Sequence, residues 1–378
     1  MEPTVIGAIG CGVISEAYLK GAARSKLIRV KSVADLSADA AEKRAAEFRV
    51  QAVSVEALLA DEEIEIVINL TVPQAHAPVS LSIIEAGKHV YCEKPLATRL
   101  ADAQALMLAA AAKRLRVGCA PDTFLGGAHQ ACRRAIDAGR IGTPVAGCTA
   151  VLSHGMEHWH PNPAFFFKRG GGPMLDMGPY YVTQLVNLLG PVTRVTAEAT
   201  MASRHRTVSS EPLRGQVIEV EVPTTVNAAL KFASGANVSL SQSWDVWKHR
   251  RLPIEIYGSE GSLLVPDPNF FGGDPLVSER DGEWQTLDID RHPFGVANRR
   301  LRSGAEVADY RIVGLLDLAA AIRRDRPHRA SGELALHVLE VLEAIERAAV
   351  EGRHVMIESG CPRPKPLPFG DGEEVFCA

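Results

Sequence analysis

Two polar side chains, Asp176 and Tyr180, stand four residues apart in the otherwise apolar stretch GGGPMLDMGPYY. Residues with this spacing lie on one face of a helix, so a helix that begins near Pro173 would bring the carboxylate and the phenol together. Pro179 favours instead a helix that starts near Gly178, because proline lacks a backbone N–H and suits the first turn. In that case Asp176 is only a helix cap. The stretch is therefore either a proton-transfer pair or a helix start that holds two polar residues.

The segment just upstream, SHGMEHWHPNPAFFF, gathers histidine, glutamate and tryptophan side chains. As a substrate wall, Trp159 offers a flat apolar face to a sugar ring, and His154 and His160 offer hydrogen bonds. As a metal site, the histidines and Glu157 supply suitable ligands, but their spacing is not H-E-x-x-H. We expect the substrate wall and no metal. A histidine of this segment is also an alternative to Tyr180 as the base.

The first strand-like run leads into GAIGCGVIS, which contains the G-x-G of a dinucleotide-binding turn. Gly10 allows the tight turn, and Gly12 lets the backbone approach a pyrophosphate at the positive N-terminus of the next helix. The third position of the fingerprint is Ser15, which is small enough to keep the helix close to the strand. We expect Val13 and Ile14 to line the cofactor as well. The GGG of the first stretch lacks a following Lys-Ser or Lys-Thr, so phosphate binding is assigned to this turn instead.

The second strand-like run ends at VADLS, which places Asp35 twenty residues after Ser15. A carboxylate at this distance can hydrogen-bond both ribose hydroxyls of a dinucleotide and would repel a 2′-phosphate. No arginine follows directly, because the next residues are Leu36 and Ser37. The pattern favours NAD over NADP, with a helix cap or a turn residue as the alternative interpretation of Asp35.

The elements that must position these residues alternate in type at the start of the chain. Short apolar runs predict strands, and the Ala-rich segments between them have helical spacing. The expected strands are 4–10, 28–34, 65–70, 89–92 and 116–120, and the expected helices include 39–48, 76–86 and 99–113. Such alternation predicts a parallel sheet that is covered on both faces.

After residue 121 the pattern changes. Helical spacing over 127–138 and 309–351 flanks four segments with period-2 alternation, VTRVTAEA, VIEVEV, VNAALKFA and NVSLSQSW. Alternation is typical of an antiparallel sheet with one packed face. We therefore predict an α/β protein with a dinucleotide-binding domain over residues 1–121 and an α+β domain over residues 122–378.

Composition argues against several classes of partner. The chain of 378 residues has a formal net charge of −4, which disfavours nucleic acid or an anionic membrane as a partner. Apolar runs such as ALMLAAAA are too short to span a bilayer, and we expect no signal peptide. The seven cysteines are dispersed without C-x-x-C spacing, which fits a reducing compartment. We expect a cytoplasmic protein whose partner is a small molecule.

An ordered set of short motifs runs through nearly the whole chain: GCGVIS, TVPQAH, AGKHVYCEKPLA, GRIGTP, D-x-G-x-Y and YGSEGSL. The set resembles the glucose–fructose oxidoreductase/inositol dehydrogenase (Gfo/Idh/MocA) family. The resemblance implies an N-terminal Rossmann domain and a C-terminal domain with a large open, mostly antiparallel sheet, which often serves as a homo-oligomer interface. It also implies an NAD(P)-dependent dehydrogenase that acts on a secondary hydroxyl of a sugar, cyclitol or related carbohydrate.

The resemblance further implies roles for the residues of two of these motifs. In the family the Lys-Pro bond of EKP is typically cis, so we expect a cis bond between Lys94 and Pro95. A surface lysine in a turn, paired with the preceding glutamate, is the alternative interpretation. The implied cofactor contacts outside the G-x-G turn and Asp35 are Thr71, Pro73, His76, Glu93 and Lys94.

The implied catalytic and substrate-binding group is Lys94, Asp176 and Tyr180, although the family usually has histidine where this chain has the tyrosine. A phenol with an ordinary pKa of about 10 is a poor general base at neutral pH. A neighbouring ammonium favours the phenolate, so a lysine and a tyrosine together form a coherent acid/base unit. Tyr180 would take the hydroxyl proton while hydride leaves the same carbon for C4 of the nicotinamide. Lys94 would stabilise the alkoxide, and Asp176 would orient the substrate hydroxyl.

Two other functions stay open at this point. The same fold can serve as a non-enzymatic dinucleotide or sugar sensor that controls a protein partner. It can also serve as a redox-neutral enzyme with tightly held NAD, which oxidises a sugar transiently to allow glycoside cleavage. Steady-state NADH production separates the dehydrogenase from both. We expect Tyr181, His337 and at least one of Trp244 and Trp247 to pack rather than to react.

Overall fold

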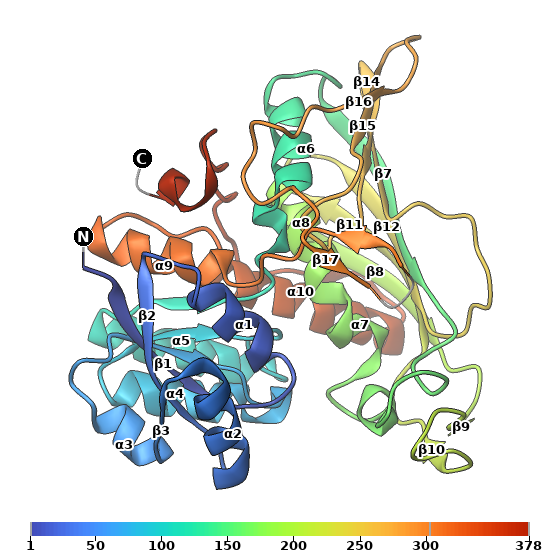
Figure 1. Cartoon of the computed structure of the whole chain (residues 1–378). Helices are drawn as coiled ribbons and strands as arrows, with labels where there is room; N and C mark the ends of the chain where they lie inside the picture. Colours follow the sequence, from blue (N-terminus) through green and yellow to red (C-terminus); the bar gives the residue numbers. More distant parts are fainter. Residues whose placement is uncertain (1, 302–303, 377–378) are drawn as a thin grey trace. The chain divides into compact units, whose positions relative to one another are not determined.

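The computed structural model describes residues 2–301 and 304–376. The chain divides into two compact units (Figure 1). Unit 1 is formed by residues 1–127, 290–339 and 364–378, and unit 2 by residues 128–289 and 340–363. The long helix α10 (Gly332–Glu351) contributes residues to both units.

A six-stranded parallel sheet with the order β3-β2-β1-β4-β5-β6 forms the centre of unit 1. Its strands are β1 (Thr4–Ile9), β2 (Ile28–Ala34), β3 (Gln51–Ala52), β4 (Ile66–Asn69), β5 (His89–Cys92) and β6 (Val117–Cys119). The helices between them are α1 (Ser15–Ala22), α2 (Ala38–Phe48), α3 (Val55–Ala60), α4 (Pro73–Glu85) and α5 (Leu100–Lys113). The predicted strands and helices of this part are confirmed; the short β3 and α3 were not predicted.

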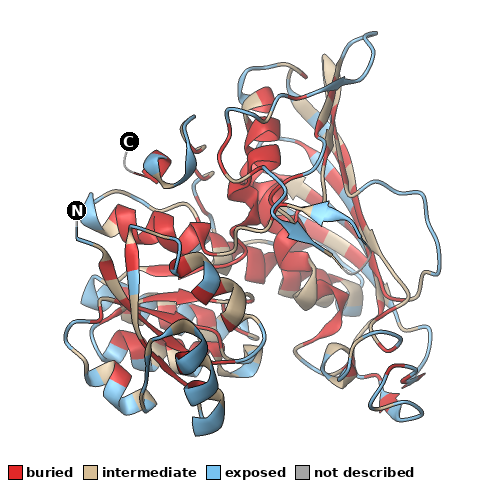
Figure 2. Ribbon diagram, in the orientation of Figure 1, coloured by how far each residue is buried: buried red, intermediate tan, exposed pale blue. Residues whose placement is uncertain are grey.

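The strand order reverses between β1 and β4, which opens a crevice at the carboxyl ends of these strands, where open α/β sheets bind their ligands. All four residues of β4 are buried, as the apolar sequence of a strand covered on both faces requires. Figure 2 shows buried residues along the central strands of unit 1. The sheet therefore carries to one edge the loops that follow β1, β2, β4 and β5. These are the loops in which the sequence places its cofactor residues.

Two later segments of the chain pack with the first 127 residues. Ser331 forms a β-bridge to Gly118 of β6, and the N–H of Cys119 donates to the carbonyl of Ala330. Helix α9 (Val313–Arg323) packs on β6, and the short strands β17 (Arg299–Arg300) and β18 (Glu306–Val307) pair with each other. A single cut at residue 121 thus differs from the division into compact units, and the division of function at that residue stays a prediction.

Unit 2 is built on a nine-stranded sheet with the order β16-β15-β14-β13-β7-β12-β11-β8-β19. Its strands are β7 (Pro144–Leu152), β8 (Val192–Thr200), β11 (Thr225–Phe232), β12 (Asn237–Ser243), β13 (Ile254–Gly258), β14 (Gly261–Val265), β15 (Leu276–Glu279), β16 (Gln285–Thr286) and β19 (Val355–Met356). Only the β7–β12 pair is parallel among the pairings of this sheet, so the predicted mostly antiparallel sheet is confirmed.

Helices of unit 2 include α6 (Gly127–Asp137), α7 (Gly172–Asp176) and α8 (Gly178–Leu189). Every residue of α8 is buried. A Cβ on Gly178 would lie 2.6 Å from Leu342 Cδ2, so α8 and α10 approach each other too closely for a side chain at this position. Short 3₁₀ turns complete the described chain at Thr123–Leu125, Ala164–Phe167 and Gly372–Phe376.

One of the four alternating segments lies outside the large sheet. In VIEVEV only β10 (Val217–Glu219) is a strand, and it pairs with β9 (His205–Thr207) in a separate two-stranded sheet. This hairpin has its own apolar cluster, in which Val208, Ile218 and Val220 pack with Phe167 and Trp244. The hairpin therefore packs on the loop that follows β7, and the alternation of VIEVEV reflects that local cluster.

Over residues 2–301 and 304–376, no helix is both long enough and apolar enough to cross a membrane. The cysteines of the described chain are all free, and five of these six are buried. The seventh, Cys377, lies outside the described residues.

Candidate active site

The turn after β1 is built for close approach of a ligand. Gly10 has φ +103°, and a Cβ on it would lie 2.5 Å from the carbonyl carbon of Leu70, so this position requires glycine. A Cβ on Gly12, by contrast, would meet nothing within 4 Å, which leaves open space over the start of α1. Ser15 is fully buried and its hydroxyl donates to the carbonyl of Gly12 at 2.6 Å, so it closes the turn against the helix. Among its neighbours, Val13 is 92% exposed.

Asp35 stands at the carboxyl end of β2, next to this turn. Its Oδ2 accepts the N–H of Cys11 at 2.7 Å, and its Oδ1 accepts the N–H of Ser37 at 2.9 Å. The contact with Ser37 gives Asp35 the role of a turn residue, which was the alternative interpretation of the sequence. The contact with Cys11 connects the carboxylate to the glycine turn. Burial, the charge of Asp35 and, in the opposite sense, Arg44 set the pKa of the Cys11 thiol at about 11. Arg44 donates to the carbonyl of Gly12 at 3.3 Å, so a guanidinium also lies beside the turn.

The loop after β4 is fixed by a buried asparagine that the sequence analysis missed. The Oδ1 of Asn69 accepts the N–H and hydroxyl of Thr71 at 3.3 and 2.7 Å. Its Nδ2 donates to the carbonyl of His76 and to the hydroxyl of Ser80, each at 2.9 Å. Pro73 is the first residue of α4, where its missing N–H costs no hydrogen bond. An asparagine that ends an apolar strand before Thr-x-Pro was the available signal.

The EKP segment follows β5 at the same edge. The Lys94–Pro95 peptide bond is cis, as expected. The Oε1 of Glu93 accepts the hydroxyl of Tyr18 in α1 at 2.8 Å, and its Oε2 accepts the N–H of Lys94 at 2.9 Å. Burial and the charge of Glu93 raise the pKa of Tyr18 well above its usual value, so this phenol stays a donor. Glu93 therefore connects the helix of the nucleotide turn to the segment that carries the lysine.

In unit 2, the stretch around Asp176 and Tyr180 forms two helices instead of one. Asp176 ends α7, Met177 follows, and Tyr180 lies in the first turn of α8, with its N–H donating to the carbonyl of Met177 at 3.1 Å. The two residues are therefore not an i, i+4 pair on one helix. The preceding glycines form the entry turn, since Gly172 has φ +85°. Asp176 is partly exposed and Tyr180 is 8% exposed.

The neighbouring tyrosine packs, as expected. Tyr181 is 2% exposed and its hydroxyl donates to Oδ1 of Asp267 at 3.3 Å. Burial and Asp267 raise its pKa well above the usual value, which makes it unsuited to accept a proton. His337 is fully buried, and Trp244 belongs to the cluster under the β9–β10 hairpin. The prediction that Tyr181, His337 and at least one of the two tryptophans pack is thus confirmed.

The predicted substrate wall lies in the loop after β7. His154 stacks on Trp247, with ring centroids 3.3 Å apart and planes 18° from parallel, and Trp247 is 79% exposed. Burial and the charge of Arg206 lower the pKa of His154, which therefore stays neutral at pH 7. Trp159 is 53% exposed and packs edge-on against His160. The loop thus presents the exposed aromatic surfaces of Trp159 and Trp247 together with the imidazoles of His154 and His160.

A buried ion-pair network holds this loop from behind, and its central residue, Arg206, was not predicted. Arg206 is 7% exposed and donates to Oε1 of Glu157 at 3.0 Å, to the carbonyl of Trp244 at 3.2 Å and to Asp245. Glu157, one of the candidate metal ligands of the sequence analysis, therefore forms an ion pair with an arginine. In the described part of the chain, no group of three or more His, Cys, Asp or Glu residues could hold a metal ion.

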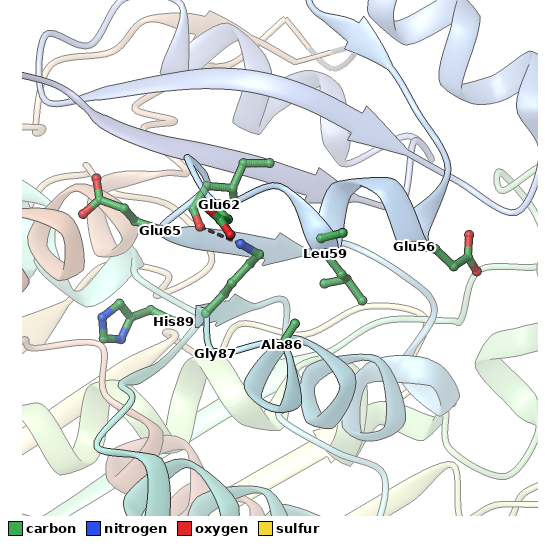
Figure 3. A pocket seen from close by; sticks show the side chains of 10 residues that line it. Glu56, Leu59, Glu62, Glu65, Ala86, Gly87 and His89 are labelled. Atoms are coloured by element: carbon green, nitrogen blue, oxygen red, sulfur yellow. Dashed lines mark hydrogen bonds between the residues drawn. The ribbon is translucent and has the colours of Figure 1, made fainter.

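A pocket of about 750 Å³ lies elsewhere in unit 1 (Figure 3). It is lined by residues that precede β4 and β5, such as Glu62, Glu65 and Gly87. It therefore lies at the amino ends of the strands, at the opposite edge of the sheet from Thr71 and Glu93. Its three glutamates would repel a pyrophosphate, so this pocket is not the cofactor site.

Comparison with known protein families and structures adds to this geometry. A model described as an oxidoreductase family with an NAD-binding Rossmann fold matches residues 5–120, and the GFO/IDH/MocA C-terminal domain matches residues 129–264. A dTDP-3,4-didehydro-2,6-dideoxy-alpha-D-glucose 3-reductase from Streptomyces violaceoruber is 30% identical over 91% of this chain and 95% of its own length.

The chain belongs to the Gfo/Idh/MocA family of oxidoreductases. Two further relatives of the family align over nearly their whole length. A 1,5-anhydro-D-fructose reductase from Ensifer adhaerens is 27% identical over 94% of this chain and 98% of its own, and an inositol 2-dehydrogenase from Rhizobium meliloti is 26% identical over 93% and 98%. An NAD-binding oxidoreductase from Klebsiella pneumoniae has the same fold, with a TM-score of 0.82, 25% identity, and coverage of 95% of this chain and 100% of its own. As a family member, the chain is an NAD(P)-dependent oxidoreductase with the Rossmann domain that the sequence predicted.

Proposed function

We propose that this protein is an NAD-dependent dehydrogenase that oxidises a secondary hydroxyl of a sugar, cyclitol or related carbohydrate, or reduces the corresponding ketone. The proposal rests on the residues at the carboxyl ends of the strands in the unit 1 sheet. There, Gly10 is forced to be glycine by the Leu70 carbonyl, and Gly12 leaves open space at the start of α1. Asp35 is tied to the same turn by the N–H of Cys11. A dinucleotide pyrophosphate and its ribose fit this chemistry.

NAD is the proposed cofactor rather than NADP. Asp35 is partly exposed, and both of its oxygens accept backbone N–H groups. These hydrogen bonds hold the carboxylate in place at the end of β2. A 2′-phosphate bound beside it would bring two negative groups together. The ribose hydroxyls of NAD would instead donate to the remaining lone pairs of the carboxylate.

The proposed catalytic group is Lys94, Asp176 and Tyr180. When bound, the nicotinamide supplies the hydride acceptor. Tyr180 takes the proton of the substrate hydroxyl, Lys94 stabilises the oxygen as it becomes negative, and Asp176 orients the hydroxyl. The hydrogen bond from the N–H of Lys94 to Glu93 and the position of Tyr180 in the first turn of a buried helix support these roles. His154, neutral at pH 7, is the alternative base.

The proposed substrate contacts of unit 2 come from His154, Trp159 and His160. The exposed indole of Trp159 suits the apolar face of a sugar or cyclitol ring, and the partly exposed imidazoles of His154 and His160 suit its hydroxyls. The relatives support this class of substrate, since those named above are an anhydrofructose reductase, a dideoxyglucose reductase and an inositol dehydrogenase. A solved structure named levoglucosan dehydrogenase, with a TM-score of 0.81 and 22% identity, shares the fold over 94% of this chain and 100% of its own.

We also propose that the free face of the nine-stranded sheet binds a second copy of this chain. Along β12, Asn237 and Ser239 are exposed while Val238 and Leu240 are buried, so one face of the sheet packs and the other does not. Ser239 lies in register with Cys148 of β7 and with Ala229 of β11, and a face of such small side chains is flat enough for a matching sheet. Sedimentation tests this, since Ser239→Arg should reduce the mass of the assembly toward the 40.6 kDa of one chain.

The enzymatic proposal is tested by NADH absorbance with a panel of inositols, monosaccharides, anhydrosugars and glycosides, with NAD and NADP compared. We expect NADH formation with at least one cyclic polyol, and a loss of at least a hundredfold in kcat for Tyr180→Phe with NAD affinity unchanged. Tyr181→Phe is the matched control, because that phenol is buried against Asp267. Near-normal turnover of both Tyr180→Phe and Lys94→Ala would refute the catalytic group. Consumption of a glycoside without net NADH would favour the redox-neutral enzyme, and NAD binding without any turnover would favour a sensor.

A further inference from the structure

His76 has an unusual hydrogen-bonding environment inside unit 1. Its side chain is 1% exposed, with Nδ1 2.6 Å from the carbonyl oxygen of Pro95 and Nε2 3.0 Å from that of Thr71. A carbonyl oxygen only accepts hydrogen bonds, and a neutral imidazole has a single N–H to donate. A neutral ring would leave one nitrogen lone pair facing a carbonyl lone pair. Only the doubly protonated imidazolium can donate to both oxygens.

The balancing negative charge comes from Cys92, which is fully buried at the end of β5. Its thiol interacts electrostatically with the ring of His76 and lies beside the hydroxyl of Ser80 and the thiol of Cys119. The hydroxyl of Ser80 already accepts the Nδ2 of Asn69 at 2.9 Å, so its own proton is available to the sulfur. The thiol of Cys119 instead donates to the carbonyl of Ala120 at 3.1 Å. A buried sulfur next to an imidazolium and a free hydroxyl donor is the environment of a thiolate, which only accepts.

The electrostatics of the cluster agree with this assignment. Burial lowers the pKa of His76, but the negative Cys92 and the two carbonyls outweigh it and bring the pKa to about 9. Burial raises the pKa of Cys92, but its neighbours Cys119 and the positively charged His76 lower it well below the usual value. Cys119 has its pKa raised by burial, by Cys92 and by Glu93, so it stays a thiol. At neutral pH the cluster therefore holds one positive and one negative charge.

The two carbonyls that the imidazolium binds belong to the two segments proposed to meet the cofactor. Thr71 is held on its other side by Asn69, which accepts its N–H and its hydroxyl. Pro95 directly follows Lys94. The ring of His76 thus bridges the cofactor loop after β4 and the lysine segment after β5, from the buried side of both.

We propose that His76 is a positioning residue whose imidazolium, balanced by the thiolate of Cys92, holds the carbonyls of Thr71 and Pro95 and so fixes the cofactor loop relative to Lys94. The inference rests on the proposed function of these two segments. It places His76 behind the cofactor loop, whereas the sequence predicted a contact with the cofactor itself. No bond is made or broken in this role, and no proton moves during turnover.

The charge of the ring can be measured without any assay of activity. An ordinary histidine, with a pKa of about 6.5, is almost entirely neutral at pH 8. In the ¹⁵N-histidine-labelled wild-type protein we expect one residue to keep both ring nitrogens protonated, with slowly exchanging protons, from pH 6 to pH 8. The signals should be missing in His76→Gln, which assigns them. A neutral ring at pH 8 would overturn the proposal.

The positioning role is tested by the pH dependence of Cys92→Ser. A serine hydroxyl does not ionise, so the imidazolium loses its counter-ion and the histidine becomes neutral within the neutral pH range. We expect the ratio of kcat at pH 8 to kcat at pH 6 to fall at least tenfold relative to wild type. Cys132→Ser is the matched control, because Cys132 is also fully buried but lies in unit 2. A purely structural loss would reduce activity equally at both pH values, and an unchanged ratio would overturn the positioning role.

The outcomes separate this inference from the proposed function. If the wild-type enzyme forms no NADH with any compound of the panel, the proposed function fails. The effect of Cys92→Ser is then measured as the ratio of NAD affinity at pH 8 to that at pH 6, by fluorescence titration. If the wild-type enzyme is active but the ring is neutral or the ratio does not change, the inference alone fails. Should Cys92→Ser not fold, His76→Lys is the second variant: its ammonium keeps the charge beside the thiolate, and we expect it to keep more activity at pH 8 than His76→Gln. Equal activity of these two variants would overturn the positioning role.

Discussion

Replacing Arg206 by methionine should destabilise unit 2 more than any exposed substitution in the same hairpin. The guanidinium contacts Glu157, Asp245 and the carbonyl of Trp244, and its side chain is 8% exposed. Methionine keeps most of the volume but leaves two carboxylates without their cation. One of them, Glu157, has an Oε2 that is buried with no hydrogen-bond partner among the described residues, so it depends strongly on the arginine.

Removing one partner of a buried ion pair costs about 3–5 kcal/mol, because the remaining charge is buried and uncompensated. In a unit of this size, about 2–4 °C of Tm is lost per kcal/mol, so we expect Tm to fall by about 6–20 °C. Asp245 also accepts the hydroxyls of Thr224 at 2.7 Å and Thr225 at 2.6 Å, which compensates part of its charge and favours the lower half of this range.

Scanning calorimetry of four proteins measures the effect: wild type, Arg206→Met, Glu157→Gln, and the double variant. Arg204→Met is the matched control, because Arg204 lies exposed in the same hairpin. The double variant should be more stable than the sum of the single changes predicts, since it removes both charges of the pair. A fall in Tm of less than 2 °C for Arg206→Met, or full additivity, would refute the view that this network holds the loop that carries His154.

Four further substitutions test the packing and the proposed cofactor turn. Gly10→Ala should lower the free energy of unfolding by about 1–3 kcal/mol, because alanine must adopt φ +103° and contact the Leu70 carbonyl. Gly12→Ala should leave Tm unchanged and weaken NAD binding at least tenfold, because its Cβ would enter the open space at the start of α1. Thermal unfolding and NAD titration of both variants test these two predictions. Asp35→Ser should shift the ratio of kcat/KM for NADP over NAD upward at least tenfold, and continued rejection of NADP would show that another group selects the cofactor. Gly178→Ala should lower the free energy of unfolding by about 1–3 kcal/mol through its contact with α10, and an unchanged denaturation midpoint would contradict the close approach of the two helices.

The gathering of Gly10, Asp35 and Glu93 at one edge of the unit 1 sheet could be predicted because each residue lies directly after a strand. Gly10 and Asp35 directly follow apolar runs, and Glu93 follows another, so identifying the strands was enough to bring them to one edge. The direction of the sheet followed from the helical segments between the strands. In the same way, Pro179 favoured a helix that starts near Gly178, as α8 does, although the sequence alone did not decide between one helix and two.

The residues that position the site were not predictable by such local patterns. Arg206 meets Glu157 and Asp245, which are 49 and 39 residues away, through a hairpin with strands of three residues. No periodicity of the sequence encodes that pairing. His76 looked like a cofactor ligand because it follows the TVPQ segment, and nothing in the sequence showed that both of its nitrogens face carbonyl oxygens.

The two units share one physical arrangement in which a buried cation holds a partly exposed functional loop from behind. In unit 1 the cation is the imidazolium of His76, behind Thr71 and the segment of Lys94. In unit 2 it is Arg206, behind the loop of Glu157. A loop whose aromatic groups stay exposed gains only part of its order from apolar burial, which in unit 2 comes from Phe167 in the cluster under the hairpin. Charged hydrogen bonds to its carbonyls and carboxylates supply the rest, since they are directional and stronger than neutral ones. This makes the cations the positions where a conservative, buried substitution should alter activity without touching the substrate.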